Sequence, residues 1–393
     1  MQSISDFLSS FFRPLTNLGR PIKLAEPFIG IGGASEMLRA AGIPVISFNV
    51  FDMEEKLEAY HSSKSANTEH HLVNARFGKN DGNFCNVPKE SLVDVDGWIS
   101  GPPCQPWAGN GFRKGRLDPR AQCFVRSVEA IEYLGSERQS LTFFALENSP
   151  NIDKKCKDGS QLTFADEMVF RLKLALPNFI IDTVIVSLCP ALPHDRTRWW
   201  LRGMRRDLCI RPWSCKLPPV LDLPVRVKLI DLLDPNLRNI PASSMTAKRA
   251  ANVVQYMELL RAKKPELDPT VELAVFDIDR AIGKKWPAQI RYDVVPALRT
   301  KGPEYFIVSI RDVEEPLPKR KFFRLLTDSE RFALQGHPVE HARFCKSRVV
   351  TRMVTGNAFA VPMVAAVVGP LMLLAFDPKP IMNSPAPKRQ RTS

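Results

Sequence analysis

The chain has 393 residues, of which 44% are hydrophobic, so it can bury the core of one large domain or two ordinary ones and is not a disordered chain. Its 55 lysines and arginines exceed its 42 acidic residues, and the formal net charge of +13 favours a polyanionic partner such as nucleic acid. The eight cysteines form no C-x-x-C pair, and the six histidines lack supporting ligands, which argues against a disulfide framework and against a metal site.

Short β-rich runs alternate with helical patterns from residue 22 to residue 204. We expect strands at residues 23–28, 45–49, 97–100, 142–147, 180–187 and 199–203. We expect helices at residues 34–41, 53–61, 121–134 and 166–176. This alternation predicts an α/β fold with a doubly wound sheet, in which ligands bind beyond the carboxyl ends of the strands.

Residues 205–320 differ, because they are rich in Pro, Lys and Arg and show no strand–helix rhythm. We interpret them as part of an inserted second domain, with a β-rich piece at residues 305–310 returning to the first sheet. The predicted division of the chain is an N-terminal extension (1–21), a first domain (22–212), an inserted region (213–320), a return to the first domain (321–376) and a basic tail (377–393).

Residues 358–376 form a stretch of nineteen residues without a charge, which is long enough to span a bilayer. Pro362, Gly369 and Pro370 interrupt it, and a proline in a lone helix leaves backbone groups unpaired in lipid. We therefore predict a buried helix that covers a sheet, and no membrane partner.

Both ends of the chain carry targeting features. The first twenty residues contain Arg13, Arg20, several serines and one acid, so an organelle-targeting segment stays open beside a frayed N-terminal helix, which we favour. The tail Pro387-Lys388-Arg389-Gln390-Arg391 resembles a short nuclear-import patch and predicts a nuclear protein.

A glycine-rich string, Glu26-Pro-Phe-Ile-Gly30-Ile-Gly32-Gly33, follows the first expected strand and opens a helix. Its glycines allow a ligand to approach the backbone and the helix N-terminus closely, although a plain tight turn has the same letters. Glu36 stands where a dinucleotide fingerprint has its third glycine, which argues against a nicotinamide cofactor.

A cysteine lies in a stiff loop after the third expected strand, in the string Gly101-Pro-Pro-Cys104-Gln105-Pro-Trp107. Two prolines hold the loop and present the thiol in a fixed geometry. Such a thiol can act as a nucleophile when an electropositive or acidic group lies beside it. A buried structural thiol is the alternative for Cys104 taken alone.

These motifs occur in an order that resembles the DNA (cytosine-5) methyltransferase family over nearly all of residues 24–370. The glycine string resembles the cofactor-binding first motif and Pro103-Cys104-Gln105 the nucleophile motif. Four later strings resemble the remaining motifs: Glu147-Asn148, His194-x-Arg196-x-Arg198, Arg324-x-Leu-Thr327-x2-Glu330 with Leu334-Gln335-Gly336, and Gly356-Asn357-Ala358. The resemblance implies a Rossmann-like methyltransferase sheet with a smaller target-recognition domain at residues 213–320.

The resemblance implies methylation of cytosine carbon 5 in DNA, with S-adenosyl-L-methionine as methyl donor and the base flipped out of the duplex. Cys104 would attack cytosine carbon 6, which makes carbon 5 nucleophilic. Glu147 would protonate the ring N3, which requires a protonated carboxyl in a dry pocket. Arg198 would hold the cytosine O2, and Arg196 the adjacent phosphate or the cysteine loop.

The resemblance also implies a cofactor site, for which it points to eleven residues: Phe28, Gly30, Gly32, Gly33, Phe51, Asp52, Asn83, Phe84, Pro102, Asn357 and Ala358. Four positions depart from the family pattern, one of them Ser149, which replaces the usual valine after Glu147-Asn148. Val50 stands where an acid usually binds the ribose hydroxyls, with Asp52 as a nearby substitute, and Asn83 replaces an acid that accepts from the adenine amine. His194 replaces the usual glutamine.

Two alternatives stay open. The same chemistry could act on RNA, since one branch of the family methylates transfer RNA, although the loop around Cys104 looks closer to the DNA-acting branch. The chain could also be a catalytically silent, nucleic-acid-binding regulator with the same fold, because Val50 and Asn83 weaken the cofactor match. Double-stranded DNA is the partner we expect, without a metal.

Overall fold

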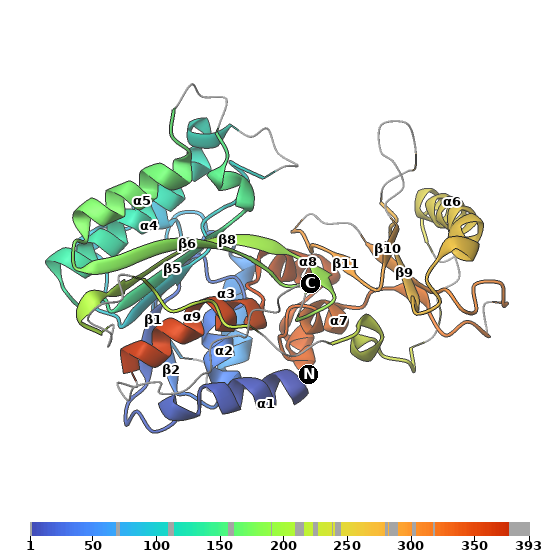
Figure 1. The fold of residues 1–393 in the computed structure, drawn as a ribbon, viewed down its shortest axis with the longest axis horizontal. Helices are drawn as coiled ribbons and strands as arrows, with labels where there is room; N and C mark the ends of the chain where they lie inside the picture. Colours follow the sequence, from blue (N-terminus) through green and yellow to red (C-terminus); the bar gives the residue numbers. More distant parts are fainter. Residues whose placement is uncertain are drawn as a thin grey trace, which may run out of the picture.

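The computed structural model describes residues 2–67, 71–108, 114–155, 161–189, 191–208, 216–222, 227–237, 239, 245–279, 282, 290–300, 304–316 and 319–376. These residues form a large lobe built on one sheet and a smaller lobe built on a second sheet (Figure 1). The basic tail, with its predicted nuclear-import patch, lies outside the described residues.

The large lobe contains a seven-stranded sheet in the order β3-β2-β1-β4-β5-β8-β6. Its strands are β1 (Ile22–Ala25), β2 (Val45–Asp52), β3 (His71–Phe77), β4 (Gly97–Ser100), β5 (Phe143–Asn148), β6 (Phe179–Ser187) and β8 (Thr197–Arg205). The first five strands are parallel, and β8 runs antiparallel between β5 and β6. The predicted doubly wound α/β sheet is confirmed. The strand order reverses between β1 and β4, which is where such sheets bind ligands.

Helices cover both faces of this sheet (Figure 1). One face carries α4 (Gln122–Glu132) and α5 (Phe164–Ala175), and the other carries α1 (Gln2–Phe11), α2 (Gly33–Ala40) and α9 (Val361–Phe376). Each face has its own apolar core. A further helix, α3 (Lys56–Ser65), lies beside β3 and the segment Val339–Phe344.

The apolar C-terminal stretch is the buried helix α9, as predicted. Residues 348–376 are long and apolar enough to cross a membrane, and 83% of the apolar window within them is buried inside the protein. Pro370 cannot donate to the carbonyl one turn earlier, and the backbone N–H of Leu221 donates to the Ala366 oxygen instead, at 2.9 Å. The helix is apolar because it packs on β5 and β6 of the sheet and against its neighbour α2 on the same face.

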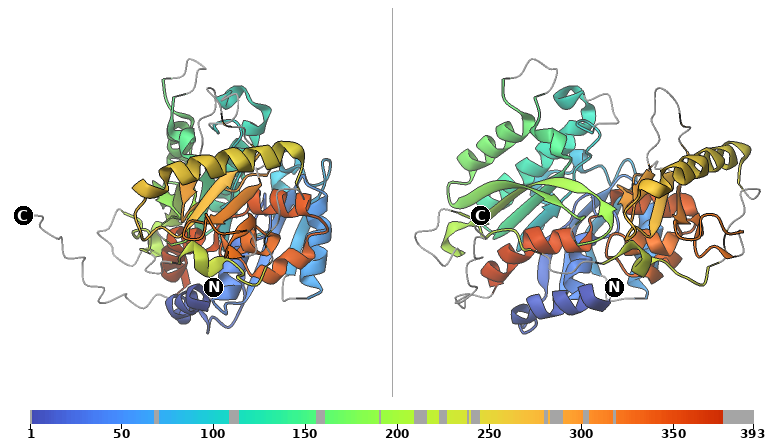
Figure 2. Two further views of the ribbon diagram at one scale, coloured as in Figure 1. Left: turned by 90° about the vertical axis from the view of Figure 1, so that its right-hand side faces the viewer. Right: turned by 45° about the vertical axis from the view of Figure 1, so that its right-hand side comes forward.

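The smaller lobe contains four antiparallel strands in the order β10-β9-β12-β13, with α6 (Ala247–Lys263) packed on one face (Figure 2). The strands are β9 (Leu273–Asp277), β10 (Ile290–Tyr292), β12 (Tyr305–Ser309) and β13 (Phe323–Leu325). Tyr256 of α6 stacks on Phe276 of β9 at 5.0 Å between ring centroids. This sheet extends to Leu325, past the predicted end of the inserted region at residue 320.

The prediction that residues 305–310 return to the first sheet is wrong, because β12 pairs with β9 and β13. Phe306 and Val308 face the core under α6, whereas Tyr305 and Ile307 face the core shared with the large lobe. Both faces of β12 are covered, so its residues are apolar without alternation and resemble a strand of the central sheet.

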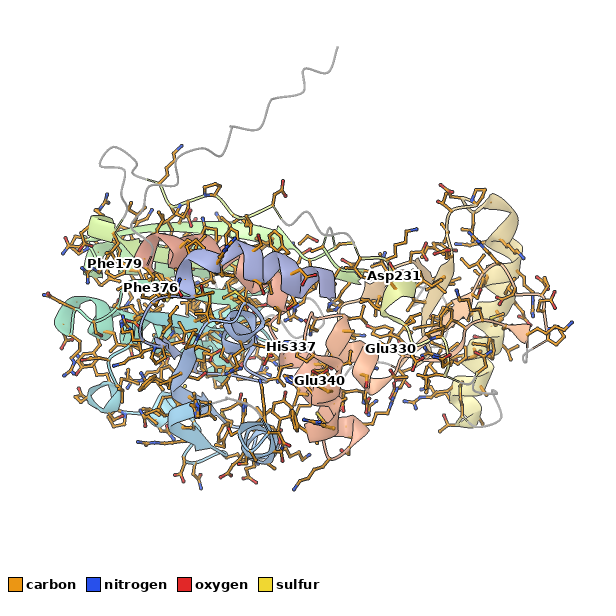
Figure 3. All side chains as sticks on the ribbon, turned by 90° about the horizontal axis from the view of Figure 1, so that it is seen from below. Phe179, Asp231, Glu330, His337, Glu340 and Phe376 are labelled. Atoms are coloured by element: carbon orange, nitrogen blue, oxygen red, sulfur yellow. The ribbon has the colours of Figure 1, made fainter. Side chains whose placement is uncertain are left out.

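A short parallel pairing joins the two lobes. Strand β7 (His194–Asp195) pairs with β11 (Val295–Pro296), and the backbone N–H of Leu298 donates to His194 Nε2 at 3.0 Å. Glu330 of α7 (Asp328–Ala333), labelled in Figure 3, accepts from the backbone N–H of Asp234 at 3.0 Å. The motif residues at 194–198 and 324–330 therefore lie where the lobes meet.

Candidate active site

The cysteine loop begins where β4 ends at Ser100. After the two prolines, the backbone N–H groups of Trp107 and Ala108 donate to the Cys104 oxygen at 3.0 and 2.9 Å, which closes a turn behind the thiol. The Trp107 ring is buried 4.8 Å from the ring of Phe164. The loop is thus anchored on both sides of Cys104, which is half-buried.

Glu147 reaches the same edge of the sheet because β4 and β5 are parallel neighbours. Ser100 pairs with Leu146, so Glu147 projects just beyond the end of β4. The side-chain amide of Asn148 donates to the Pro102 oxygen at 3.1 Å and ties β5 to the cysteine loop. A Cβ atom on Gly101 would lie 3.4 Å from Glu147 Oε2, so the loop and the carboxyl are in contact.

Two arginines arrive from the antiparallel neighbour of β5. Glu147 pairs with Trp200 of β8, which places Arg198 beside the end of β5. Arg198 Nε lies 2.5 Å from Glu147 Oε1, and Arg196 Nη2 lies 3.7 Å from the same oxygen. Arg196 also donates to the Ala358 oxygen at 2.8 Å, which links this group to the last motif. The structure therefore brings together all four residues proposed for the chemistry.

The groups around the Cys104 thiol shift its pKa in opposite directions. Burial raises the pKa of Cys104, Arg198 and Arg196 act to lower it, and the Glu147 carboxylate acts to raise it, with a net pKa above the ordinary value. Burial, followed by repulsion from Arg198, lowers the pKa of Arg196 to about 9, so this arginine stays a cation at neutral pH. The thiol is therefore mostly protonated at neutral pH.

Several polar atoms at this site have no hydrogen-bond partner among the described residues. They are buried and comprise Nε and Nη1 of Arg196 and Oε1 of Gln105. Buried polar groups of native proteins are nearly always paired, and an unpaired group costs about 1–3 kcal/mol. These atoms fit a polar ligand placed beside Cys104 and Glu147.

The glycine loop follows β1 at the strand-order reversal. Phe28, Gly30 and Gly32 have φ angles of 58°, 54° and 80°, which is left-handed backbone. A Cβ atom on Gly33 would lie 2.6 Å from the Cβ of Phe359, so only glycine fits at the start of α2. A Cβ on Gly30 would lie 3.6 Å from the Asn357 oxygen, so the first and last motifs are neighbours.

The aromatic residues proposed for the cofactor form one cluster. Phe51 stacks on Phe84 at 5.5 Å between centroids, and Phe28 meets Phe84 edge-on at 5.6 Å. Asp52 accepts from the Gly30 N–H at 3.4 Å, and burial raises the pKa of Asp52 to about 6. The carboxyl thus contacts the glycine loop, next to the buried Val50.

Asn83 is engaged locally. Its side-chain oxygen accepts from the Cys85 N–H at 3.1 Å and caps the short 3-10 helix Phe84–Asn86. The other end of the Asn83 side chain is an NH2 group, which donates hydrogen bonds. It therefore cannot accept from the adenine amine as the second oxygen of an acid could.

Phe359 is a site residue that the sequence motifs did not indicate. Cβ atoms on Gly33 and on Gly101 would lie 2.6 Å and 2.9 Å from it, so its side chain separates the glycine loop from the cysteine loop. It also packs against Trp200 at 5.7 Å. The sequence feature that could have indicated Phe359 is its position directly after the motif Gly356-Asn357-Ala358.

Among the described residues, no group of three or more His, Cys, Asp or Glu side chains could hold a metal ion. The geometry defines a class of α/β protein in which a thiol, a carboxyl and two arginines meet beyond a parallel sheet, next to a glycine loop. The family model for C-5 cytosine-specific DNA methylases matches residues 22–372. The chain belongs to this family, whose members use S-adenosyl-L-methionine as a general property.

Relatives and solved structures share this architecture at low identity. The type II methyltransferase M.MthTI of Methanothermobacter thermautotrophicus is 26% identical over 309 residues, covering 73% of this chain and 83% of that protein. The orphan methyltransferase M.Rho11sI of Bacillus phage rho11s is also 26% identical, but the match spans only 34% of its length and 48% of this chain. The tRNA (cytosine(38)-C(5))-methyltransferase of Schizosaccharomyces pombe is 23% identical, covering 49% of this chain and 52% of that protein.

Two solved structures show the same fold. The Entamoeba histolytica methyltransferase EhMeth has a TM-score of 0.55 at 18% identity, covering 91% of this chain and 99% of its own. Spodoptera frugiperda DNMT2 has a TM-score of 0.54 at 14% identity, covering 89% of this chain and 99% of its own. The predicted Rossmann-like fold of the family is confirmed.

Proposed function

We propose that the chain methylates carbon 5 of cytosine in DNA, with S-adenosyl-L-methionine as methyl donor. The observation that supports this most is the meeting of the Cys104 loop, Glu147, Arg196 and Arg198 beyond the ends of β4 and β5. A nucleophile, a proton donor and two cations within one pocket are the groups that this reaction requires.

The residues of the glycine loop fit the cofactor. Left-handed glycines at Gly30 and Gly32 allow close approach to the backbone, and Phe28, Phe51 and Phe84 offer aromatic surface beside them. When bound, S-adenosyl-L-methionine supplies an electrophilic methyl group. The glycine loop and these aromatic residues would hold it.

On the base side, the Cys104 thiolate forms a bond to cytosine carbon 6 while Glu147 gives a proton to ring N3. This makes carbon 5 nucleophilic. After methyl transfer, a water molecule takes the carbon 5 proton, the bond between carbon 6 and sulfur breaks, and Cys104 leaves as a thiolate. Ring N3 returns its proton to the Glu147 carboxylate, which restores the ring. Because the pKa of Cys104 is raised, little thiolate exists in the free protein, and we assign its formation to the binding of the base.

The arginines have different roles. Arg198 lies next to the carboxyl of Glu147 and could hold the cytosine O2 with its outer nitrogens. Arg196 is anchored on the Ala358 oxygen, and its unpaired Nε and Nη1 could receive a phosphate or a polar edge of the base. Arg196 would therefore bind the substrate and, through its hydrogen bond, hold the backbone at Ala358 in place.

Methylation of RNA is a second candidate, favoured by the tRNA methyltransferase relative and by the DNMT2 fold neighbour. The loop around Cys104 resembles the DNA-acting branch and makes DNA our first choice. Single-stranded and duplex oligonucleotides that contain 5-fluorocytosine, as DNA and as RNA, separate the two with S-adenosyl-L-methionine present. This base blocks the elimination step and traps the enzyme covalently.

We expect a trapped adduct with DNA that is absent in Cys104→Ser. If only the RNA oligonucleotides form an adduct, the substrate is RNA and the proposal of DNA is wrong. No adduct with either, together with retained nucleic-acid binding, would identify the chain as a silent regulator.

A further inference from the structure

The glycine loop is supported from behind by one helix. His61 and Lys64, one turn apart on α3, both point at loop carbonyls: His61 Nε2 lies 2.8 Å from the Gly30 oxygen, and Lys64 Nζ donates to the Ile31 oxygen at 3.3 Å. Both side chains are only 1% exposed. A fully buried lysine is rare unless it is paired, so its position needs a reason.

The ammonium of Lys64 is paired with the carboxyl of Glu36 in the first turn of α2, at 2.7 Å. Burial opposes the ionised form of Glu36, but neighbouring positive charges, led by Lys64, outweigh burial and lower the pKa of Glu36 to about 2. Burial lowers the pKa of Lys64, and Glu36 opposes this shift. The pair is therefore a charged one that bridges α3, the loop and α2.

The histidines next to the pair are neutral. Burial lowers the pKa of His61 to about 3, so His61 meets the Gly30 carbonyl as a neutral ring with its proton on Nε2. His337, labelled near the middle of Figure 3, lies 2.9 Å through Nε2 from the oxygen of Phe359. Buried donors thus hold the backbone of both the loop and the residue that separates the two loops.

The direction of these carbonyls decides what the loop presents. A trans peptide unit turns its C=O and its N–H to opposite sides. With the Gly30 carbonyl turned to α3, the N–H of Ile31 points away from α3 and could donate to a ligand on the other side of the loop. Glycines lose more backbone freedom on ordering than other residues, so a glycine loop without anchors would bind its ligand less tightly.

We propose that Lys64 and His61 are positioning residues of the cofactor site, which hold the Ile31 and Gly30 carbonyls so that the loop is preformed for S-adenosyl-L-methionine. This inference rests on the proposed function. Lys64 and His61 do not touch the cofactor in this arrangement; they act through the loop backbone.

A double variant separates positioning from folding. Lys64→Met alone leaves the Glu36 carboxylate buried beside Arg39 and is expected to destabilise the fold. Glu36→Leu combined with Lys64→Met removes both charges and keeps an apolar core, but the Ile31 oxygen loses its donor. Because Arg39 also loses its partner Glu36, we expect the double variant to stay folded with a urea midpoint above that of Lys64→Met but below that of the wild type. Its Kd for S-adenosylhomocysteine, measured by calorimetry, should rise about tenfold.

His61 offers a rescue test. Glutamine can donate a hydrogen bond to the Gly30 oxygen and leucine cannot, so His61→Gln should keep the Kd within about threefold and His61→Leu should raise it about tenfold. In turnover, KM for the methyl donor should rise with little change in kcat. Lys56→Met, at an exposed position of the same helix, is the matched control and should bind like the wild type.

The outcomes distinguish the two claims. Wild-type protein that binds neither S-adenosylhomocysteine nor S-adenosyl-L-methionine would overturn the proposed function. Wild-type protein that binds, with the double variant and His61→Leu binding equally tightly, would overturn the positioning role alone.

A separate observation concerns two cysteines at the aromatic side of the same site. Cys85 Sγ and Cys123 Sγ lie 3.4 Å apart, although the residues are 38 positions apart in the chain. Cys85 is half-buried and follows Asn83 and Phe84, whereas Cys123 is buried in the first turn of α4. The hydrogen bond from Cys123 outweighs burial and lowers the pKa of Cys85 to about 7, so Cys85 is partly a thiolate at neutral pH.

We infer that a hydroperoxide converts Cys85 and Cys123 into a disulfide that alters the cofactor site. The Cys85 thiolate attacks a peroxide oxygen, the O–O bond breaks, hydroxide leaves, and Cys85 becomes a sulfenic acid. The Cys123 sulfur then attacks Cys85 Sγ, the S–O bond breaks, and water leaves with the Cys123 proton. The bond draws the helix Phe84–Asn86 towards α4 and displaces Phe84 from Phe51.

Peptide mapping of the full chain after one equivalent of hydrogen peroxide tests this inference. We expect a crosslink between residues 85 and 123, an increase of about tenfold in the Kd for S-adenosylhomocysteine, and reversal of both by dithiothreitol. Cys123→Ser should leave a sulfenic acid on Cys85 that dimedone traps. Cys85→Ser should show neither effect. A missing crosslink, or a crosslink without a change in Kd, would overturn the inference.

Discussion

The two ends of the site are built in different ways. At the thiol end, the working groups are side chains. Cys104 follows β4, Glu147 lies at the end of β5 and Arg198 lies on β8, and these three strands are neighbours in the sheet. At the glycine-loop end, the working surface is backbone, and side chains such as Lys64 act from behind it. The reaction fixes the residue type of each reacting side chain. A backbone carbonyl, in contrast, can be held by any side chain that donates a hydrogen bond and is long enough to reach it.

Phe359 connects the two ends. Its ring is in contact with Gly101 of the cysteine loop, and its Cβ is in contact with Gly33 of the glycine loop. The oxygen of the preceding residue, Ala358, accepts from Arg196, and the Phe359 oxygen is held by His337. A change at one end can therefore reach the other through this single turn of backbone.

The largest expected effect is at the thiol end. Cys104→Ser replaces a strong nucleophile by a weak one, so methyl transfer should fall by about 10³-fold or more. The measurement is transfer of a labelled methyl group to cytosine-containing DNA. S-adenosylhomocysteine should still bind with wild-type Kd, because the substitution leaves the glycine loop and its aromatic residues unchanged. Loss of binding would show that the cofactor site depends on the thiol end as well as on the glycine loop.

Glu147→Gln should reduce turnover by about 10²- to 10⁴-fold, since the amide keeps the shape of the carboxyl but cannot deliver a proton. The amide also ends the ion pair with Arg198. Single-turnover rates with saturating cofactor measure the effect. A rate within threefold of wild type would exclude Glu147 as the proton donor.

Features that depend on neighbouring residues in the chain could be predicted from the sequence, whereas features that depend on distant residues could not. Strand β4 was predicted to the residue, because four buried residues end at a proline-rich loop. Strand β3 was missed, since this edge strand is largely exposed and has the mixed letters HLVNARF. Lys64 and His61 could not be found, because their burial depends on α2 and on the segment Val339–Phe344, which is far away in the sequence.

At the glycine-loop end, the expected effect is first on stability. Lys64→Met leaves the Glu36 carboxylate in a buried site with Arg39 as its remaining strong partner, and removing one partner of a buried pair typically costs about 3–5 kcal/mol. Lys56→Met, on the solvent side of α3, should change the free energy of unfolding by less than about 0.5 kcal/mol. Urea unfolding of both variants measures the contrast. Equal stabilities would mean that the buried pair contributes nothing.

Acid should destabilise the fold through its buried histidines. Burial lowers the pKa of His61 and His341 to about 3 and of His337 to about 4, and lowers that of His194 too. Below about pH 6.5 the unfolded chain binds protons that the folded chain excludes, so stability falls as pH falls.

From pH 7 to 5.5 the four histidines together should remove about 5 kcal/mol from the free energy of unfolding. Asp52 acts in the opposite sense, because its raised pKa of about 6 means that the folded state takes up a proton first, which offsets about 1 kcal/mol. Urea midpoints at the two pH values measure the net loss. His341→Gln should shrink it by about 1 kcal/mol; an unchanged loss would show that His341 is not the neutral group described.

The smallest expected effect compares two thiols, one at each end. Burial raises the pKa of Cys104, whereas the hydrogen bond from Cys123 lowers that of Cys85 to about 7. At pH 7.5 without substrate, iodoacetamide should therefore alkylate Cys85 about tenfold faster than Cys104, because the thiolate is the reacting form. Peptide mapping over time gives both rates. Faster alkylation of Cys104 would mean that its thiolate exists before the base arrives, and the activation of the nucleophile could then no longer be assigned to substrate binding.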